Sequence, residues 1–109
     1  MKKSMLWCAL SCLFFFVPEL ASAQVAFVRI TDASKVDYQT SGSYVYLRNM
    51  NLFDANAQGC CYAYWIDTST PEGKNIFTIF LESIALQQGM WVALPPGYGT
   101  GAVTFSGNW

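Results

Sequence analysis

A single stretch of this chain has the hydrophobic period of an α-helix, and its place between strand-like segments constrains the fold more than any other feature. Thr70 suits the N-cap position, Pro71 the first helical position, and Glu72 the positive end of the helix dipole. Gly89 predicts the end of the helix. Apolar residues at spacings of three and four form one face: Ile76, Phe77, Phe80, Leu81 and Ile84. The pattern predicts one amphipathic helix that packs against a sheet.

Short segments rich in β-branched and aromatic residues surround this helix and predict strands. Three precede it and two follow it, at residues 25–31, 44–48, 60–67, 90–94 and 102–105. In the second segment, tyrosines alternate with Val45 and Leu47, so the aliphatic side is expected to face inward. The third segment is apolar on both faces, which indicates a strand inside the fold or at a subunit contact. The segments between them are predicted to be loops: 32–43, 49–59 and 95–101.

The predicted order, β-β-β-α-β-β, specifies an α+β fold. It suits a small five-stranded antiparallel Greek-key barrel of the oligonucleotide/oligosaccharide-binding (OB) type, with the helix between strands three and four. An open antiparallel sheet with the same strands and one helix is the alternative. The chain has 109 residues, of which 53% are hydrophobic and 12% charged. This composition predicts one folded domain over residues 24–109 rather than a disordered tail.

Residues 1–23 are predicted to be a secretory signal peptide that is cleaved. A positive n-region is followed by an apolar run over residues 5–17 and by a small-x-small cleavage site that ends at Ala23. The apolar run is shorter than the roughly 20 residues that span a bilayer, so no membrane insertion is expected after cleavage. We therefore expect a secreted or periplasmic protein that begins at Gln24.

Only two cysteines follow the predicted cleavage site, and they are adjacent: Cys60 and Cys61. Two cysteines in an exported protein suggest a disulfide, although adjacent α-carbons, about 3.8 Å apart, lie closer than most disulfides require. Three interpretations stay open: two reduced, buried cysteines that act as small hydrophobes, a vicinal disulfide at the start of a strand, and cross-links to another chain. Two adjacent cysteines offer too few ligands for structural zinc, so no metal site is predicted.

The residues of common catalytic sites are missing or have a structural explanation. The chain has no histidine, which excludes histidine-dependent triads, Cys-His pairs and His-ligated zinc. The carboxylates Asp67, Glu72 and Glu82 are explained by a turn, the first helical turn and a solvated helix face. Gly73-Lys74 lacks the rest of a phosphate-binding loop, and Gly73 is expected instead to let the helix pack closely on the sheet. We predict no catalytic residue, no cofactor and no enzymatic activity.

Aromatic residues, 17% of the chain, give the strongest indication of a binding surface. Tyr44 and Tyr46 share one face of their predicted strand, and Tyr62 and Tyr64 share one face of the next. Rows of tyrosines on a sheet can stack on sugars or anchor a protein partner while their hydroxyls stay in water. We therefore predict that these four tyrosines form a surface that binds a ligand or partner. The alternative is that they fill the core.

The segment 66–74 reads I-D-T-S-T-P-E-G-K and resembles a loose group of small exported bacterial proteins. These proteins share a strand, an I-D-T-S-T-x-x-G-K turn, an amphipathic helix and a following strand, and the resemblance covers residues 60–94. In length, export and element order the chain also resembles the B subunits of pentameric bacterial toxins of the subtilase-cytotoxin type. That resemblance implies a small barrel, a homo-oligomer and binding of cell-surface glycans. The adjacent cysteines depart from the toxin pattern, and no stretch matches the sugar-binding loop, so no sugar-binding residue is carried over.

Together these observations predict a secreted or periplasmic, non-enzymatic binding module that works as a homo-oligomer and recognises a glycan or a protein. The net charge of −1 and the lack of a basic run in the sequence argue against nucleic acid as the partner. The alternative is a structural or accessory exported protein, such as a partner subunit or an inhibitor, without ligand chemistry of its own.

Overall fold

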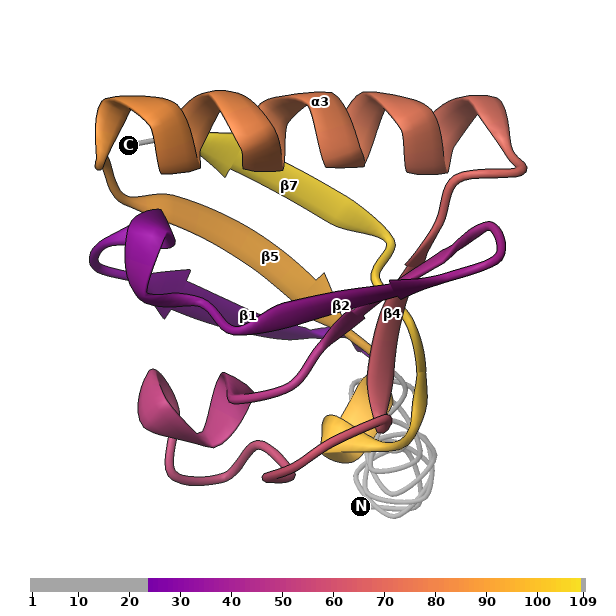
Figure 1. The fold of residues 1–109 in the computed structure, drawn as a ribbon. Helices are drawn as coiled ribbons and strands as arrows, with labels where there is room; N and C mark the ends of the chain where they lie inside the picture. Colours follow the sequence, from indigo (N-terminus) through magenta and orange to yellow (C-terminus); the bar gives the residue numbers. More distant parts are fainter. Residues whose placement is uncertain (1–23, 109) are drawn as a thin grey trace, which may run out of the picture.

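Strands before and after one helix are present as predicted, but they form two sheets (Figure 1). The computed structural model describes residues 24–108, so the predicted signal peptide lies outside the described residues. In chain order the elements are β1 (Ala26–Ile30), the 3₁₀ turn η2 (Ala33–Lys35), β2 (Tyr38–Ser41), β3 (Tyr44–Leu47), η3 (Met50–Leu52), β4 (Tyr64–Asp67), the helix α3 (Pro71–Leu86), β5 (Met90–Leu94), η4 (Pro96–Tyr98), β6 (Gly101–Ala102) and β7 (Phe105–Asn108). The predicted α+β class is confirmed.

The two sheets are joined by the chain itself. One sheet has the strand order β1-β5-β7 and the other β2-β3-β4-β6, and all neighbours are antiparallel except β4 and β6, which run parallel. β1 leads through η2 into β2, and β6 leads into β7. At this second link the N–H of Val103 donates to Trp65 O of β4 (2.7 Å), and the N–H of Thr104 donates to Ala93 O of β5 (3.1 Å). The chain therefore changes sheets between two consecutive residues.

The core lies between the inner faces of the two sheets and beneath α3. Figure 1 shows the helix running above β5 and β7, and it contacts β7, η2 and β4. Ile76 and Phe80 of the helix are buried against the sheets. Val45 and Leu47 are also buried, so the prediction that the aliphatic side of this strand faces inward is confirmed.

The start of α3 lies where the sequence predicts it. Thr70 Oγ1 accepts the N–H of Gly73 at 3.0 Å and donates to the Asp67 carbonyl at 3.1 Å, and Pro71 is the first helical residue. Gly73 lies so close to β4 that a Cβ atom at this position would overlap the Asp67 carbonyl oxygen. The prediction that Gly73 permits close packing of the helix on the sheet is confirmed.

The helix ends earlier than the sequence predicts. Leu86 is its last residue, and Gln87 adopts a left-handed conformation (φ 53°). The Gln87 N–H then caps carbonyls of the last turn, so the predicted stop at Gly89 is wrong by two residues.

The predicted strand 60–67 is wrong in its first half. Only Tyr64–Asp67 pairs with β3, whereas residues 60–63 form bends that include a disulfide between Cys60 and Cys61. Side chains of adjacent strand residues point to opposite faces, and two cysteines bonded to each other cannot do so. Strand pairing therefore begins only after the disulfide.

The predicted loop 32–43 contains a strand that hydropathy does not reveal. β2 is exposed along its whole length, yet its backbone pairs with β3, and Gly42 (φ 60°) makes the tight turn between them. The last predicted strand, 102–105, is divided into β6 and β7 because the chain changes sheets within it.

Candidate functional site

The outer face of the four-stranded sheet carries an aromatic surface, which we call the tyrosine face: Tyr44, Tyr46, Tyr62 and Trp65. Tyr46 of β3 lies opposite Trp65 of β4, and the residues between the outward rings point into the core. Because strand side chains alternate, Tyr44 also points outward. These rings are half-buried except for Tyr62, which is 54% exposed.

The rings of the tyrosine face contact one another in a continuous row. Tyr44 stacks on Trp65 with ring centroids 5.5 Å apart and planes 18° apart. Tyr46 meets Tyr62 edge-on at 5.1 Å and also contacts Trp65 at 6.1 Å. Stacked and edge-to-face pairs are the favoured arrangements of aromatic rings. The four rings therefore form one continuous aromatic surface.

Arg48 and the disulfide lie at one end of this row. The Arg48 N–H donates to Asp37 O at 2.8 Å, which continues the β2–β3 ladder and keeps the arginine side chain on the outward side. The guanidinium carbon lies 5.9 Å from the centre of the Tyr62 ring. Its Nη2 donates to the sulfur atoms of Cys61 (3.3 Å) and Cys60 (3.7 Å).

The adjacent cysteines form the vicinal disulfide, one of the three interpretations that the sequence left open. Cys60 is exposed and Cys61 is half-buried. The structure therefore differs from the interpretation of two reduced, buried cysteines, and it places the sulfur atoms beside the tyrosine face.

Tyr64 does not belong to the tyrosine face, and this corrects the sequence prediction. It is 0% exposed, and its hydroxyl donates to Tyr98 O at 2.8 Å and accepts the N–H of Gln58 at 3.0 Å. Because strand pairing begins only at Tyr64, the preceding Tyr62 is not held on the same face. Tyr64 is a core residue, as the alternative of core filling described.

The Tyr64 hydroxyl is part of a network that ties two loops together. Gln58 Nε2 donates to Tyr98 O at 2.9 Å, and the Tyr98 hydroxyl donates to Asp54 Oδ2 at 2.7 Å. The bond to the Asp54 carboxylate raises the pKa of Tyr98, because loss of the proton would place two negative charges side by side. The network joins the loop before the disulfide to the loop before β6.

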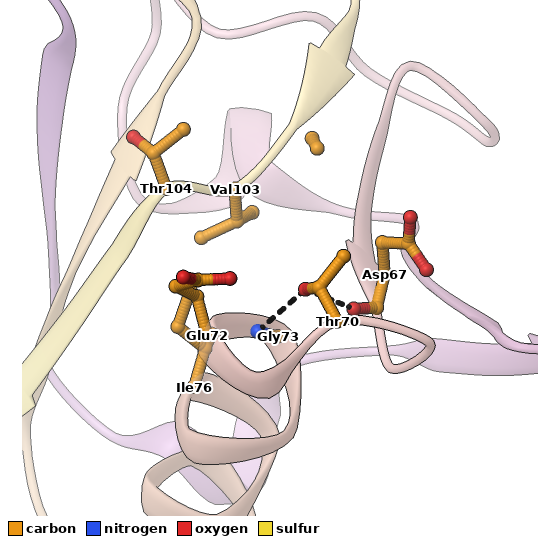
Figure 2. A pocket seen from close by; sticks show the side chains of 8 residues that line it. Asp67, Thr70, Glu72, Gly73, Ile76, Val103 and Thr104 are labelled. Carbon is orange, nitrogen blue, oxygen red and sulfur yellow. Dashed lines mark hydrogen bonds between the residues drawn. The ribbon is translucent and has the colours of Figure 1, made fainter.

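A pocket of about 300 Å³ lies where α3 begins. Figure 2 shows it between the first turn of the helix and the segment that links β6 to β7. The residues that line it come from both sides: Asp67, Thr70, Glu72, Gly73, Ile76, Ala102, Val103 and Thr104. The lining thus combines two threonines and two acidic residues with apolar residues, and the Thr70 hydroxyl is already bonded within the helix cap.

The pocket adjoins the tyrosine face through two cross-strand pairs. Asp67 pairs with Tyr44, and Ala102 pairs with Trp65. Asp67 Oδ1 accepts the N–H and the hydroxyl of Ser69, at 3.0 and 2.6 Å, which closes the turn before the helix and fixes the carboxylate. A few placed polar groups beside aromatic rings are typical of small-ligand sites.

The outer face of the three-stranded sheet carries a second aromatic surface, which we call the phenylalanine face: Phe27, Trp91 and Phe105. Both phenylalanines lie opposite Ala93 of β5, and their rings meet edge-on at 5.7 Å. Phe27 is 54% and Phe105 46% exposed. The guanidinium carbon of Arg29 lies 5.8 Å from the centre of the Trp91 ring. The two phenylalanine rings offer a partner apolar contact but no hydrogen bond.

The carboxylates considered as catalytic candidates lie where their structural explanations place them. Asp67 ends β4 in a turn, and Glu72 and Glu82 are exposed on α3. Within residues 24–108, no cluster of three or more His, Cys, Asp or Glu side chains could hold a metal ion. In the same part of the chain, no helix is long and apolar enough to cross a membrane.

No family model, curated protein or solved structure matches this chain. The site therefore has to be interpreted from its own residues. Sequence reasoning placed Tyr44, Tyr46 and Tyr62 on the surface but left out Trp65 and Arg48. A signal for Trp65 was present, because Tyr64 shares a strand face with Ile66, an aliphatic residue suited to the core, and this parity directs Trp65 outward.

Proposed function

We propose that this protein is an exported, non-enzymatic binding module that recognises a glycan through the tyrosine face and the pocket beside it. The observation that carries the proposal is the Tyr44–Trp65 stack next to a pocket whose lining includes threonines and acidic residues. Sugars present C–H surfaces that pack on aromatic rings and hydroxyls that bond to such polar groups. Export is supported by the sequence of residues 1–23.

We also propose an OB-like barrel as the scaffold of this module. When β1 with β2, and β6 with β7, are each counted as one bent strand, the pairings link five strands in a cycle. The helix follows the third of these strands, as the predicted barrel requires. The parallel pairing of β4 with β6 differs from the fully antiparallel barrel that the sequence predicted.

A glycan array tests the proposed function, with the exported protein purified without reductant. We expect binding to a defined subset of glycans. Trp65→Ala should weaken that binding about thirtyfold or more, because it removes a central ring of the row. Leu86→Ala, at an exposed position of α3 outside both aromatic surfaces, is the control and should keep the affinity of the unmodified protein. Circular dichroism establishes that both variants fold. A protein that binds no glycan, or equal losses in the two variants, would contradict the proposal.

A second candidate function, contact with a protein, is favoured by the phenylalanine face. Phe27 and Phe105 flank β5 and form an exposed apolar surface. Burial of this surface against a partner would remove it from water, which is favourable. The partner we propose is another copy of this chain, which would make the module a homo-oligomer. Native mass spectrometry should show an assembly that Phe27→Asp dissociates and Tyr62→Asp does not. A monomeric unmodified protein would direct attention to the accessory-protein alternative, in which a different exported protein covers this face.

A further inference from the structure

We propose that the tyrosine face ends in a subsite for an anionic group of the ligand, a carboxylate or a sulfate ester carried on a sugar, and that Arg48 binds it. The inference rests on the proposed function, because it names the class of glycan that the tyrosine face takes. It is carried by the hydrogen-bond inventory of Arg48, by its charge environment and by its position in the row.

Arg48 is poorly supplied with hydrogen-bond acceptors. A guanidinium has five N–H donors. Within residues 24–108 the side-chain hydrogen bonds of Arg48 run from Nη2 to the two disulfide sulfurs, and the guanidinium also lies over the Tyr62 ring. Sulfur is a weak acceptor. Nε is buried and has no partner in that part of the chain. The charge has thus lost water on one side without gaining a strong hydrogen bond in exchange, which is unfavourable.

Arg48 also has no hydrogen-bonded carboxylate partner among the described residues. Asp37 is its neighbour across the β2–β3 ladder, but it meets Arg48 through its backbone carbonyl. None of the contacts that Arg48 makes within residues 24–108 is with a carboxylate. An oxyanion that reaches both Nη1 and Nη2 would accept two parallel, charge-assisted hydrogen bonds, the geometry in which arginine binds carboxylates and sulfate-like groups best.

The position of Arg48 suits a ligand that lies along the row of rings. Tyr62 contacts both Tyr46 and the guanidinium, at 5.1 and 5.9 Å, so Arg48 is one ring away from the centre of the tyrosine face. The disulfide sulfurs accept hydrogen bonds from Nη2 and so help to position the guanidinium. A sugar packed on these rings could direct an acidic substituent to Arg48, whereas a neutral sugar would form no ion pair with the guanidinium.

Three matched sugars test the subsite: N-acetyllactosamine, the same disaccharide with a 6-sulfate, and the same disaccharide with a terminal glucuronate. Their affinities for the exported protein are measured by surface plasmon resonance at low and at high salt. We expect one or both charged sugars to bind about tenfold or more tightly than the neutral one, with the advantage reduced at high salt. The sulfate and glucuronate arms show which anion the subsite prefers.

Variants of the two arginines separate the subsite from a general charge effect. Arg48→Gln should lower the affinity for the charged sugars to that for the neutral sugar. Arg48→Lys should keep part of the preference, because lysine keeps the positive charge but cannot donate two parallel hydrogen bonds as a guanidinium does. Arg29→Gln removes the matching arginine of the opposite sheet and should leave the preference intact. Equal affinities for charged and neutral sugars, or a preference that survives Arg48→Gln, would overturn the subsite.

The failure of this inference is distinguishable from the failure of the proposed function. Binding without charge preference that Trp65→Ala still weakens would overturn the anion subsite and support the glycan-binding face. No binding of any of the three sugars or of any glycan on the array would overturn both.

Discussion

The two sheets turn similar aromatic surfaces outward, and the surroundings of the rings make them different. Each surface contains a tryptophan and an arginine over a ring, at 5.9 Å for Arg48 over Tyr62 and 5.8 Å for Arg29 over Trp91. The tyrosine face adds hydroxyls, a pocket and a disulfide, whereas the phenylalanine face adds two exposed hydrocarbon rings. Aromatic content alone therefore does not distinguish a surface for a polar ligand from one for an apolar contact. The polar groups at the edge of the rings do.

Gly73→Ala should have the largest effect, because it moves the helix away from the sheet that carries the tyrosine face and leaves the phenylalanine face unchanged. The added Cβ would overlap the Asp67 carbonyl oxygen, so the helix must move away from β4 and from the pocket. We expect a loss of about 3 kcal/mol in the free energy of unfolding, measured by chemical denaturation. Gly42→Ala is the control: nothing lies within contact of its Cβ position, so only the left-handed φ of 60° is penalised, by about 1 kcal/mol. Equal losses would contradict the role of Gly73.

A pair of tyrosine variants distinguishes the inner and outer faces of one sheet. Tyr64→Phe removes a buried hydroxyl. The N–H of Gln58 then loses its acceptor, and the carbonyl of Tyr98 loses one of its donors. We expect a loss of about 2 kcal/mol in the free energy of unfolding. Tyr46→Phe removes a hydroxyl from the outward side and should change stability by less than about 0.5 kcal/mol while weakening ligand binding. The reverse pattern in thermal unfolding and binding assays would show that the two tyrosines have been assigned to the wrong faces.

Local signals predicted the parts of this fold that depend on local chemistry. The Thr70 cap, Pro71 and the close approach at Gly73 were readable because each residue type has a specific backbone role. The inward Val45 and Leu47 followed from simple alternation. The same reasoning placed Tyr44 and Tyr46 on the outer side of the sheet.

The errors arose where pairing between distant segments decides the structure. β2 has no apolar period and exists because β3 offers it hydrogen bonds. Tyr64 was grouped with Tyr62 because the strand was extended back to Cys60. Strand pairing begins only at Tyr64, so the alternation of faces does not extend to Tyr62. The pocket was not predictable, since Glu72 and Thr104 come together only through the change of sheets after β6.

Alkaline pH should produce the smallest effect, confined to the loops that support the tyrosine face. Since the pKa of Tyr98 is raised in the folded protein by its bond to Asp54, the bond contributes fully below the ordinary tyrosine pKa of about 10, and its contribution is lost as the pH rises through the folded value. We expect the difference in melting temperature between the unmodified protein and Asp54→Asn to be constant near neutral pH and to shrink above pH 10. The change should be small because solvent screens a bond near the surface.

A tyrosinate absorbance titration supplies the control for this pH effect, because Asp54→Asn should bring the ionisation of one tyrosine to lower pH. A difference in melting temperature that stays constant through the alkaline range would show that Tyr98 does not couple the loops. The two phenylalanines of the opposite face do not titrate, so alkaline pH provides a way to loosen the surroundings of one aromatic surface while the rings of the other keep their chemistry. If Asp54→Asn weakens ligand binding at neutral pH, where the unmodified protein keeps the Tyr98–Asp54 bond, the loops contribute to the shape of the tyrosine face as well as to its stability.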